Sequence, residues 1–217
     1  MKEDKLQKYI ESLIPPRQGI LAEMETYADE HRVPIMEATG IETMLQILRM
    51  KQAETILEVG TAIGYSALRM AFALPKSKIV TIERDKERFS KAKEYIQRAE
   101  KEDQITTVFG DALEVVDQAG SLGPFDVLFI DAAKGQYQRF FELYSAFLKP
   151  GGIVVTDNVL FKGLVATQDS PTKRIQNLVK KIDHFNHWLT NHPDYDTVIL
   201  PVGDGVAISV KRGEENE

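Results

Sequence analysis

One short stretch constrains this chain more than any other, residues 55–66 with the sequence TILEVGTAIGYS. Its ILEV run is typical of a strand buried on both faces of a parallel sheet. Gly60 and Gly64 bracket a turn, and apolar residues at helical spacing follow over 67–74. A strand, a glycine turn and a helix N-terminus together form a corner where a nucleotide-like ligand can approach free backbone N–H groups.

The spacing of this turn separates two classes of nucleotide-binding fold. Dinucleotide-binding turns read G-x-G-x-x-G, with a third glycine for close packing of the helix. Here the pattern is E-x-G-x-x-x-G-x-S, with Glu58 in the strand and only two glycines. This disfavours a dehydrogenase, and the turn resembles that of S-adenosylmethionine (SAM) methyltransferases, whose cofactor has no pyrophosphate. The turn alone is equally compatible with a role in packing only.

Strand and helix patterns alternate after an N-terminal helical layer. The expected helices include 86–100, Asp111–Ala119, and one after the fourth strand that carries Lys134 in its first turn and ends at 149–152. A Gly-Asp-Gly turn between 197–201 and 205–210 predicts an antiparallel hairpin. We expect an α/β, Rossmann-like SAM methyltransferase fold: a seven-stranded, mostly parallel sheet with helices on both faces, a C-terminal hairpin and N-terminal helices. The first five strands should cover the ILEV run, 78–83, 105–109, 125–131 and 153–156, and residues 1–217 should form one domain, with a helical layer over 1–51 and a core over 52–212.

Composition narrows the functional classes. The 217 residues include no cysteine, which excludes disulfides and thiolate metal sites and fits a cytoplasmic location. The N-terminal segment does not resemble a signal peptide, and no apolar run is long enough to cross a membrane. The formal net charge of −6 argues against generic affinity for nucleic acid but leaves room for a local basic patch.

Carboxylates follow several of the predicted strands. In an open α/β sheet, ligands bind at the carboxyl ends of the strands. Glu83 comes about 20 residues after the glycine turn, where a carboxylate can accept hydrogen bonds from ribose hydroxyls. Asp111 is placed to face an adenine amino group. Each of these side chains could instead only cap the end of its strand.

A sharper cluster is expected from Asp131, Asp157 and Asn158. Two carboxylates and an amide oxygen are hard donors that suit Mg²⁺, or another hard divalent cation such as Ca²⁺ or Mn²⁺, better than zinc. Lys134 lies three residues after Asp131, and a bound cation would lower its pKa toward that of a general base. The alternatives are an ordinary Asp-Asn turn and a solvated surface lysine.

With these positions, the chain resembles the metal-dependent SAM O-methyltransferases, the family that includes the catechol and caffeoyl-CoA enzymes. The segments that carry the resemblance are ILEVGTAIGYSALRMA, VTIERD, FIDAAKGQY, GGIVVTDNVLFKG and PVGDGVAIS. The resemblance implies that Lys134 is the catalytic base and that Asp131, Asp157 and Asn158 bind Mg²⁺. It implies a SAM site formed by Met36, Glu58, Gly60, Ser66, Glu83, Asp111, Ala112 and Asp131.

Within this family the chain is similar to the tRNA 5-hydroxyuridine methyltransferases, through VPIMEATG, NHWLTNHPDY and several of the same segments. That implies transfer to the wobble 5-hydroxyuridine of the tRNA anticodon loop, giving 5-methoxyuridine. The basic segment 161–181, with Asp169 as its only acid, could contact phosphates, and Phe161 or Trp188 could hold a flipped base. A small catechol-like phenol remains the alternative substrate, and a non-catalytic SAM-binding module the alternative class. The N-terminal helices could form the contact of a homodimer.

Overall fold

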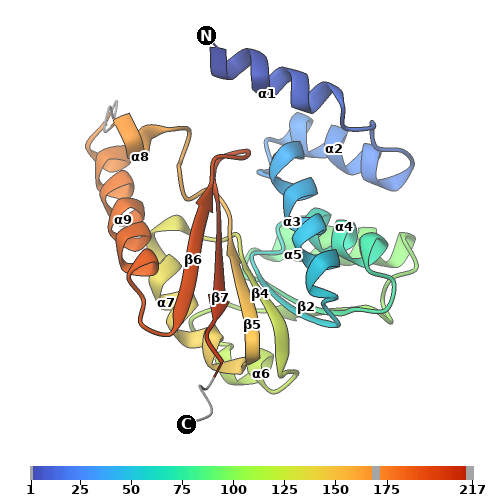
Figure 1. The fold of residues 1–217 in the computed structure, drawn as a ribbon. Coiled ribbons are helices and arrows are strands. Elements are labelled where there is room, and N and C mark those ends of the chain that lie inside the picture. Colours follow the sequence, from blue (N-terminus) through green and yellow to red (C-terminus); the bar gives the residue numbers. More distant parts are fainter. Residues whose placement is uncertain (1, 168–171, 214–217) are drawn as a thin grey trace.

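The computed structural model describes residues 2–167 and 172–213, and it contains the predicted seven-stranded sheet (Figure 1). Residues 168–171, including Asp169, lie outside the described residues. The strand order is β3-β2-β1-β4-β5-β7-β6. β1 to β5 pair in parallel, and β7 pairs antiparallel with both β5 and β6. The predicted Rossmann-like fold with a C-terminal hairpin is therefore confirmed. The strands are β1 Thr55–Val59, β2 Lys78–Glu83, β3 Ile105–Phe109, β4 Phe125–Ile130, β5 Leu148–Thr156, β6 Tyr195–Leu200 and β7 Val206–Lys211.

Helices cover both faces of the sheet. α3 and α4 pack on one face, and α7 and α9 on the other (Figure 1). No helix of the described residues is both long and apolar enough to cross a membrane. The helices are α1 Lys2–Ser12, α2 Ile20–His31, α3 Ala38–Lys51, α4 Tyr65–Ala73, α5 Lys86–Arg98, α6 Val116–Gly120, α7 Tyr137–Tyr144, α8 Leu164–Thr167 and α9 Lys173–Thr190, with the 3₁₀ turns η1 Lys134–Gln136 and η2 Ser145–Phe147.

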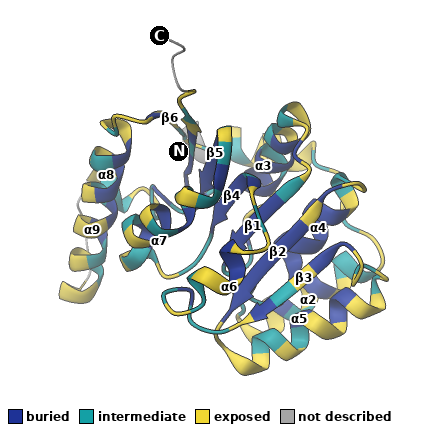
Figure 2. Cartoon of the chain, turned by 90° about the horizontal axis from the view of Figure 1, so that it is seen from below, coloured by how far each residue is buried: buried dark blue, intermediate teal, exposed yellow. Residues whose placement is uncertain are grey.

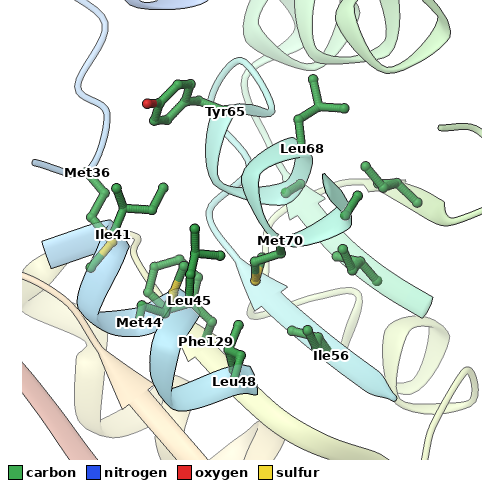
Figure 3. Close-up of a cluster of buried hydrophobic side chains, with 14 of the residues drawn as sticks. Met36, Ile41, Met44, Leu45, Leu48, Ile56, Tyr65, Leu68, Met70 and Phe129 are labelled. Atoms are coloured by element: carbon green, nitrogen blue, oxygen red, sulfur yellow. The ribbon is translucent and has the colours of Figure 1, made fainter. Parts of the chain in front are cut away.

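The sheet separates two hydrophobic cores, and successive residues of one strand enter opposite cores. Ile56 packs with the α3–α4 side, whereas its neighbour Leu57 packs with the α7–α9 side. Figure 3 shows side chains of α3, among them Met44 and Leu48, directed toward β1 and β4. The strands at the centre of the sheet are buried, and exposed residues lie on the outer sides of the helices (Figure 2). This double burial explains why the strands read as continuous apolar runs.

The predicted boundaries of three elements were wrong. The expected helix over Asp111–Ala119 begins only at Val116, because the Asp111 carboxylate and carbonyl accept the N–H groups of the following residues in a turn. The helix before β5 begins at Tyr137, so Lys134 lies in the preceding 3₁₀ turn and not in its first turn, and the helix ends at Tyr144 rather than at 149–152. Residues 149–152 belong to β5, where a register shift between the β4–β5 pairs accommodates the proline and the glycines.

The first helix lies apart from the sheet. α1 contacts α3, and the Gln7 side-chain amide donates to Thr39 Oγ1 at 2.9 Å. Its apolar face is open to solvent, with relative exposures of 60% for Leu6, 62% for Tyr9 and 40% for Ile10, and Leu13 just after the helix is 63% exposed. Within the part of the chain that the structure describes, this face stays largely uncovered. The predicted homodimer therefore stays a prediction, and α1 offers a surface for it.

Candidate active site

The glycine corner depends on the missing side chain of Gly60. Its φ is +110°, and a Cβ atom there would lie 2.0 Å from the carbonyl oxygen of Asp131. The backbone N–H groups of Gly60 and Thr61 both donate to the carbonyl of Ile82, each at 3.1 Å. Glycine therefore lets the carboxyl ends of β1, β2 and β4 meet at one point.

A buried hydrogen-bond network lies under this corner. Glu58 is fully buried, and its carboxylate accepts hydrogen bonds from the hydroxyls of Ser66 and Thr81. Thr81 also bonds to the hydroxyl of Thr61 at 2.5 Å. Burial raises the pKa of Glu58 from 4.5 to about 7, although the two hydroxyl donors oppose the shift. The network therefore places a carboxyl with a strongly perturbed pKa directly beneath the predicted cofactor site.

Four of the predicted cofactor residues line one small cavity: Met36, Gly60, Ser66 and Asp131. Its volume is about 10 Å³. The segment 34–36 and the turn residues Thr61 and Ala62 line the same cavity.

Glu83 and Asp111 lie at the carboxyl ends of β2 and β3, where each also serves its own backbone. The Glu83 carboxylate accepts the N–H of Ala62 at 2.8 Å, so it fixes the glycine turn. It also accepts the N–H groups of Arg84 and Asp85. The Asp111 carboxylate accepts the backbone N–H of Leu113 at 2.9 Å and pairs with Arg84 at 3.1 Å. Both contacts lower the pKa of Asp111. Strand capping and ligand binding are compatible here because each carboxylate oxygen accepts more than one hydrogen bond.

Ala112 completes the predicted cofactor set. Its side chain is buried, and its carbonyl accepts the hydroxyl of Tyr144 at 2.6 Å. This bond ties the segment after β3 to α7, on the far side of the sheet from Glu58. The backbone around Ala112 is therefore held in place without any bound ligand.

The second cluster lies where β4 and β5 end side by side. Asp131 follows β4 and Asp157 follows β5, and the Asp157 N–H donates to the carbonyl of Ile130 at 3.1 Å. Asn158 has a left-handed backbone with φ of +58°, and its amide donates to the Asp157 carboxylate at 3.1 Å. The Lys134 ammonium, in η1, donates to the Asn158 amide oxygen. The four predicted residues therefore do come together.

The charged groups of this cluster shift one another's pKa values. Burial raises the pKa of both Asp131 and Asp157, and the negative charge of Asp131 raises that of Asp157 further. Burial also lowers the pKa of Lys134, while the two carboxylates oppose that shift. The site therefore holds two carboxylates that repel each other and one lysine that only partly compensates them.

This donor set fits a hard divalent cation. Within the described residues no three His, Cys, Asp or Glu side chains form a metal-binding group, and the set here would combine the carboxylates of Asp131 and Asp157 with the amide oxygen of Asn158. A cation there would relieve the repulsion of the carboxylates. For the Asn158 amide oxygen to bind the cation, Lys134 would have to give up its hydrogen bond to that oxygen. The released amine would remain next to the site.

Two residues of this region, Tyr137 and Asp204, were not predicted to belong to the site, and one of the two predicted aromatic residues lies elsewhere. The Tyr137 hydroxyl donates to the Asp157 carbonyl at 2.9 Å. Asp204, interpreted only as a turn residue, is buried and accepts the N–H of Lys162. Phe161 does lie near the base, with its ring centroid 5.8 Å from the Lys134 nitrogen. Trp188 does not: it packs edge-on against Phe141 at 5.2 Å in the α7–α9 core.

A family profile described as O-methyltransferase matches residues 14–212. The chain belongs to the O-methyltransferase family. The catechol O-methyltransferase of Niastella koreensis is 33% identical, over 88% of this chain and 89% of the relative. A Staphylococcus aureus structure, assigned provisionally as a caffeoyl-CoA O-methyltransferase, has a TM-score of 0.89 and 35% identity and covers 94% and 98% of the two chains. TomG from Streptomyces achromogenes, solved with SAM, has a TM-score of 0.81 and 26% identity over 96% of each chain.

These findings confirm the predicted enzyme class, a SAM-dependent O-methyltransferase of the caffeoyl-CoA and catechol type. They carry no information on the tRNA-modifying subgroup. The metal, the partner and the roles of individual residues in this O-methyltransferase stay predictions.

Proposed function

We propose that this O-methyltransferase uses SAM and Mg²⁺ to methylate the 5-hydroxyl of 5-hydroxyuridine at the tRNA wobble position, giving 5-methoxyuridine. The observation that carries the proposal is the convergence of Lys134 with Asp131, Asp157 and Asn158 at the ends of β4 and β5. A module that only binds SAM needs neither a lysine nor a pair of repelling carboxylates at this position. Gly60 and the residues around it would form the adjoining cofactor side.

The chemistry follows from the groups at these strand ends. When bound, SAM supplies the methyl group and Mg²⁺ supplies Lewis acidity that makes a neighbouring hydroxyl easier to deprotonate. The Lys134 amine would accept the proton of the acceptor hydroxyl, and the resulting oxyanion would be held at the strand ends as the nucleophile for the methyl group. Phe161 lies over Lys134 and would limit the access of water to it. Alignment of the reacting atoms can contribute roughly 7–11 kcal/mol to lowering the barrier.

Two acceptors fit this chemistry, because each presents a hydroxyl beside a second oxygen. 5-Hydroxyuridine offers its 5-hydroxyl and the neighbouring 4-carbonyl, and a catechol offers two hydroxyls. The similarity to the tRNA-modifying subgroup and the basic segment 161–181 favour the nucleoside. The identity to a catechol O-methyltransferase favours a small phenol. We therefore keep the catechol as the second candidate.

The test is methyl transfer from labelled SAM to two acceptors offered in parallel, a tRNA that contains 5-hydroxyuridine and a simple catechol. Each reaction is run with Mg²⁺ and with excess EDTA. We expect metal-dependent labelling of the tRNA at the wobble position, much faster than labelling of catechol. Labelling of catechol alone would agree with the proposed chemistry but contradict the RNA acceptor. Full activity in EDTA would contradict the role of the metal.

We also propose that the enzyme is a homodimer that uses the apolar face of α1. The support is the exposure of Leu6, Tyr9 and Ile10 on that helix and of Leu13 just after it. Two copies of such a face related by a two-fold axis would cover each other.

A further inference from the structure

A second hollow lies next to the proposed active site. It is bounded by η1 and the start of α7 on one side and by α9 on the other, and its volume is about 470 Å³. α7 and α9 lie side by side on one face of the sheet (Figure 1). Lys134 lines the hollow as well as contacting Asn158. A group bound in the hollow would therefore be next to the proposed base.

The lining of this hollow is strongly basic. Besides Lys134, it includes Arg139 from α7 and Lys180, Lys181 and His184 from α9, and we call this set the basic hollow. The Lys181 nitrogen lies 3.6 Å from where a Cβ atom of Gly135 would be, so it reaches across to η1.

The carboxylates near this set do not form ion pairs with it among the described residues: Asp131 and Asp157 lie near Lys134, and Asp111, which lies near Arg139, pairs with Arg84. The one acidic residue of the lining, Glu142, has its carboxylate bonded to the Gln138 amide at 2.8 Å. The Arg139 guanidinium donates to the Gln136 amide oxygen at 3.4 Å, and its charge also helps to lower the pKa of Asp111. Within residues 2–167 and 172–213, neither Arg139 nor the lysines of α9 form an ion pair.

Such a concentration of like charge has no evident stabilising role. Cations that face the same space repel each other. The chain as a whole carries a net charge of −6, so acidic residues that could neutralise these cations are abundant elsewhere in the chain. A guanidinium fork together with ammonium groups is the donor set that matches phosphate oxygens. The volume lies within the range of roughly 300–1,000 Å³ for small-ligand sites.

We propose that the basic hollow is a subsite that binds a phosphate group of the methyl acceptor. The inference rests on the proposed function, because Lys134 marks where the acceptor hydroxyl would lie. The phosphate could belong to the backbone of an RNA chain or to a low-molecular-weight phosphoester. In either case the preferred acceptor is a phosphorylated molecule rather than a free phenol.

The test is a binding measurement without turnover. Dissociation constants are determined for inorganic pyrophosphate and for a short unmodified RNA stem-loop, with the wild type and the variants Arg139→Gln and Lys181→Gln. Lys93→Gln is the matched control, because Lys93 is an exposed lysine on α5, outside the basic hollow. All four proteins should fold equally well, since the substituted side chains are exposed.

We expect each hollow variant to weaken binding about tenfold, the effect of losing one charge-assisted contact, and Lys93→Gln to leave it unchanged. Loss with both probes would indicate a general phosphate subsite, and loss with the stem-loop alone would identify an RNA phosphate. Equal dissociation constants for all four proteins, an equal loss in the Lys93 control, or no binding of either probe would overturn the proposal.

This outcome is separable from that of the proposed function. If the wild type binds the probes through Arg139 and Lys181 but transfers no methyl group, the subsite stands and the proposed reaction fails. If the wild type methylates its acceptor but the hollow variants bind the probes as well as the wild type does, the reaction stands and the subsite fails.

Discussion

Replacing Glu58 by glutamine should make the stability of this O-methyltransferase less dependent on pH. Glu58 is fully buried beneath the glycine corner, where it accepts hydrogen bonds from Ser66 and Thr81. A glutamine has nearly the same shape and can keep both partners, because its amide can donate to Thr81 while that hydroxyl donates to Thr61. The substitution therefore removes a titration without leaving a cavity.

The magnitude follows from the pKa of Glu58. Burial raises it from 4.5 to about 7. Because the folded-state pKa lies above the unfolded-state value, this stabilising contribution is complete below about pH 4.5 and is lost as the pH rises through about 7. At about 1.4 kcal/mol per pH unit, the free energy of unfolding of the wild type falls by about 3 kcal/mol over this window. The variant lacks this titration and does not show that loss.

The assay is thermal unfolding of both proteins between about pH 5 and about pH 8, in EDTA and without cofactor. For a chain of 217 residues, 3 kcal/mol corresponds to a difference of about 6–12 °C in Tm. We expect the Tm of Glu58→Gln to exceed that of the wild type increasingly as the pH rises. Parallel Tm curves for the two proteins would refute the reasoning, because they would show that the buried carboxyl does not change its protonation in this window.

Four further predictions concern the corner, the strand ends and α1. Gly60→Ala should destabilise the fold by about 3 kcal/mol or more in urea unfolding, because its Cβ would lie 2.0 Å from a carbonyl oxygen, whereas Gly64→Ala, with a nearest contact of 3.3 Å, should cost less. Asp157→Ala should abolish metal-dependent methyl transfer but leave SAM binding by calorimetry largely intact, and transfer equal to wild type would contradict its role. Lys134→Ala should lower turnover more at neutral than at high pH, so a loss independent of pH would exclude it as the base. Tyr9→Ser should shift the sedimentation coefficient toward that of a monomer, and an unchanged value would remove α1 from the interface.

The sequence predicted the sheet well because the physics of its strands is local. Residues buried on both faces, such as Ile56 and Leu57, must be apolar whichever core they enter, so their run marks a strand without knowledge of its partners. The boundary of β5 could not be predicted in this way. Pro150 and its two following glycines normally end an element, but here the pairing of Leu148 with Phe125 across a register shift extends the strand over them.

The same difference between local and distant contacts decides which residues of the site could be predicted. Asp131 and Asp157 were predictable because they follow buried strands whose ends must meet at one edge of the sheet. Asp204 was not, since its role depends on accepting the N–H of Lys162, more than 40 positions away along the chain. The basic hollow was predictable only as a charged segment. Which of its cations share one space depends on how α9 packs against η1.

The strand ends of this enzyme hold an electrostatic imbalance that its ligands are suited to correct. Burial raises the pKa of Glu58, Asp131 and Asp157 together, so the ligand-free fold keeps three carboxyl groups where the charged form is unfavourable. A sulfonium cofactor and a divalent cation would each bring positive charge to these groups and favour their ionised forms. Binding of either ligand near neutral pH should therefore release protons, and the number released, measured by calorimetry in buffers of different ionisation enthalpy, should fall in Glu58→Gln for SAM but not for Mg²⁺. A site that had evolved for stability alone would place apolar side chains there, so the imbalance is itself an argument that these residues are kept for binding and catalysis.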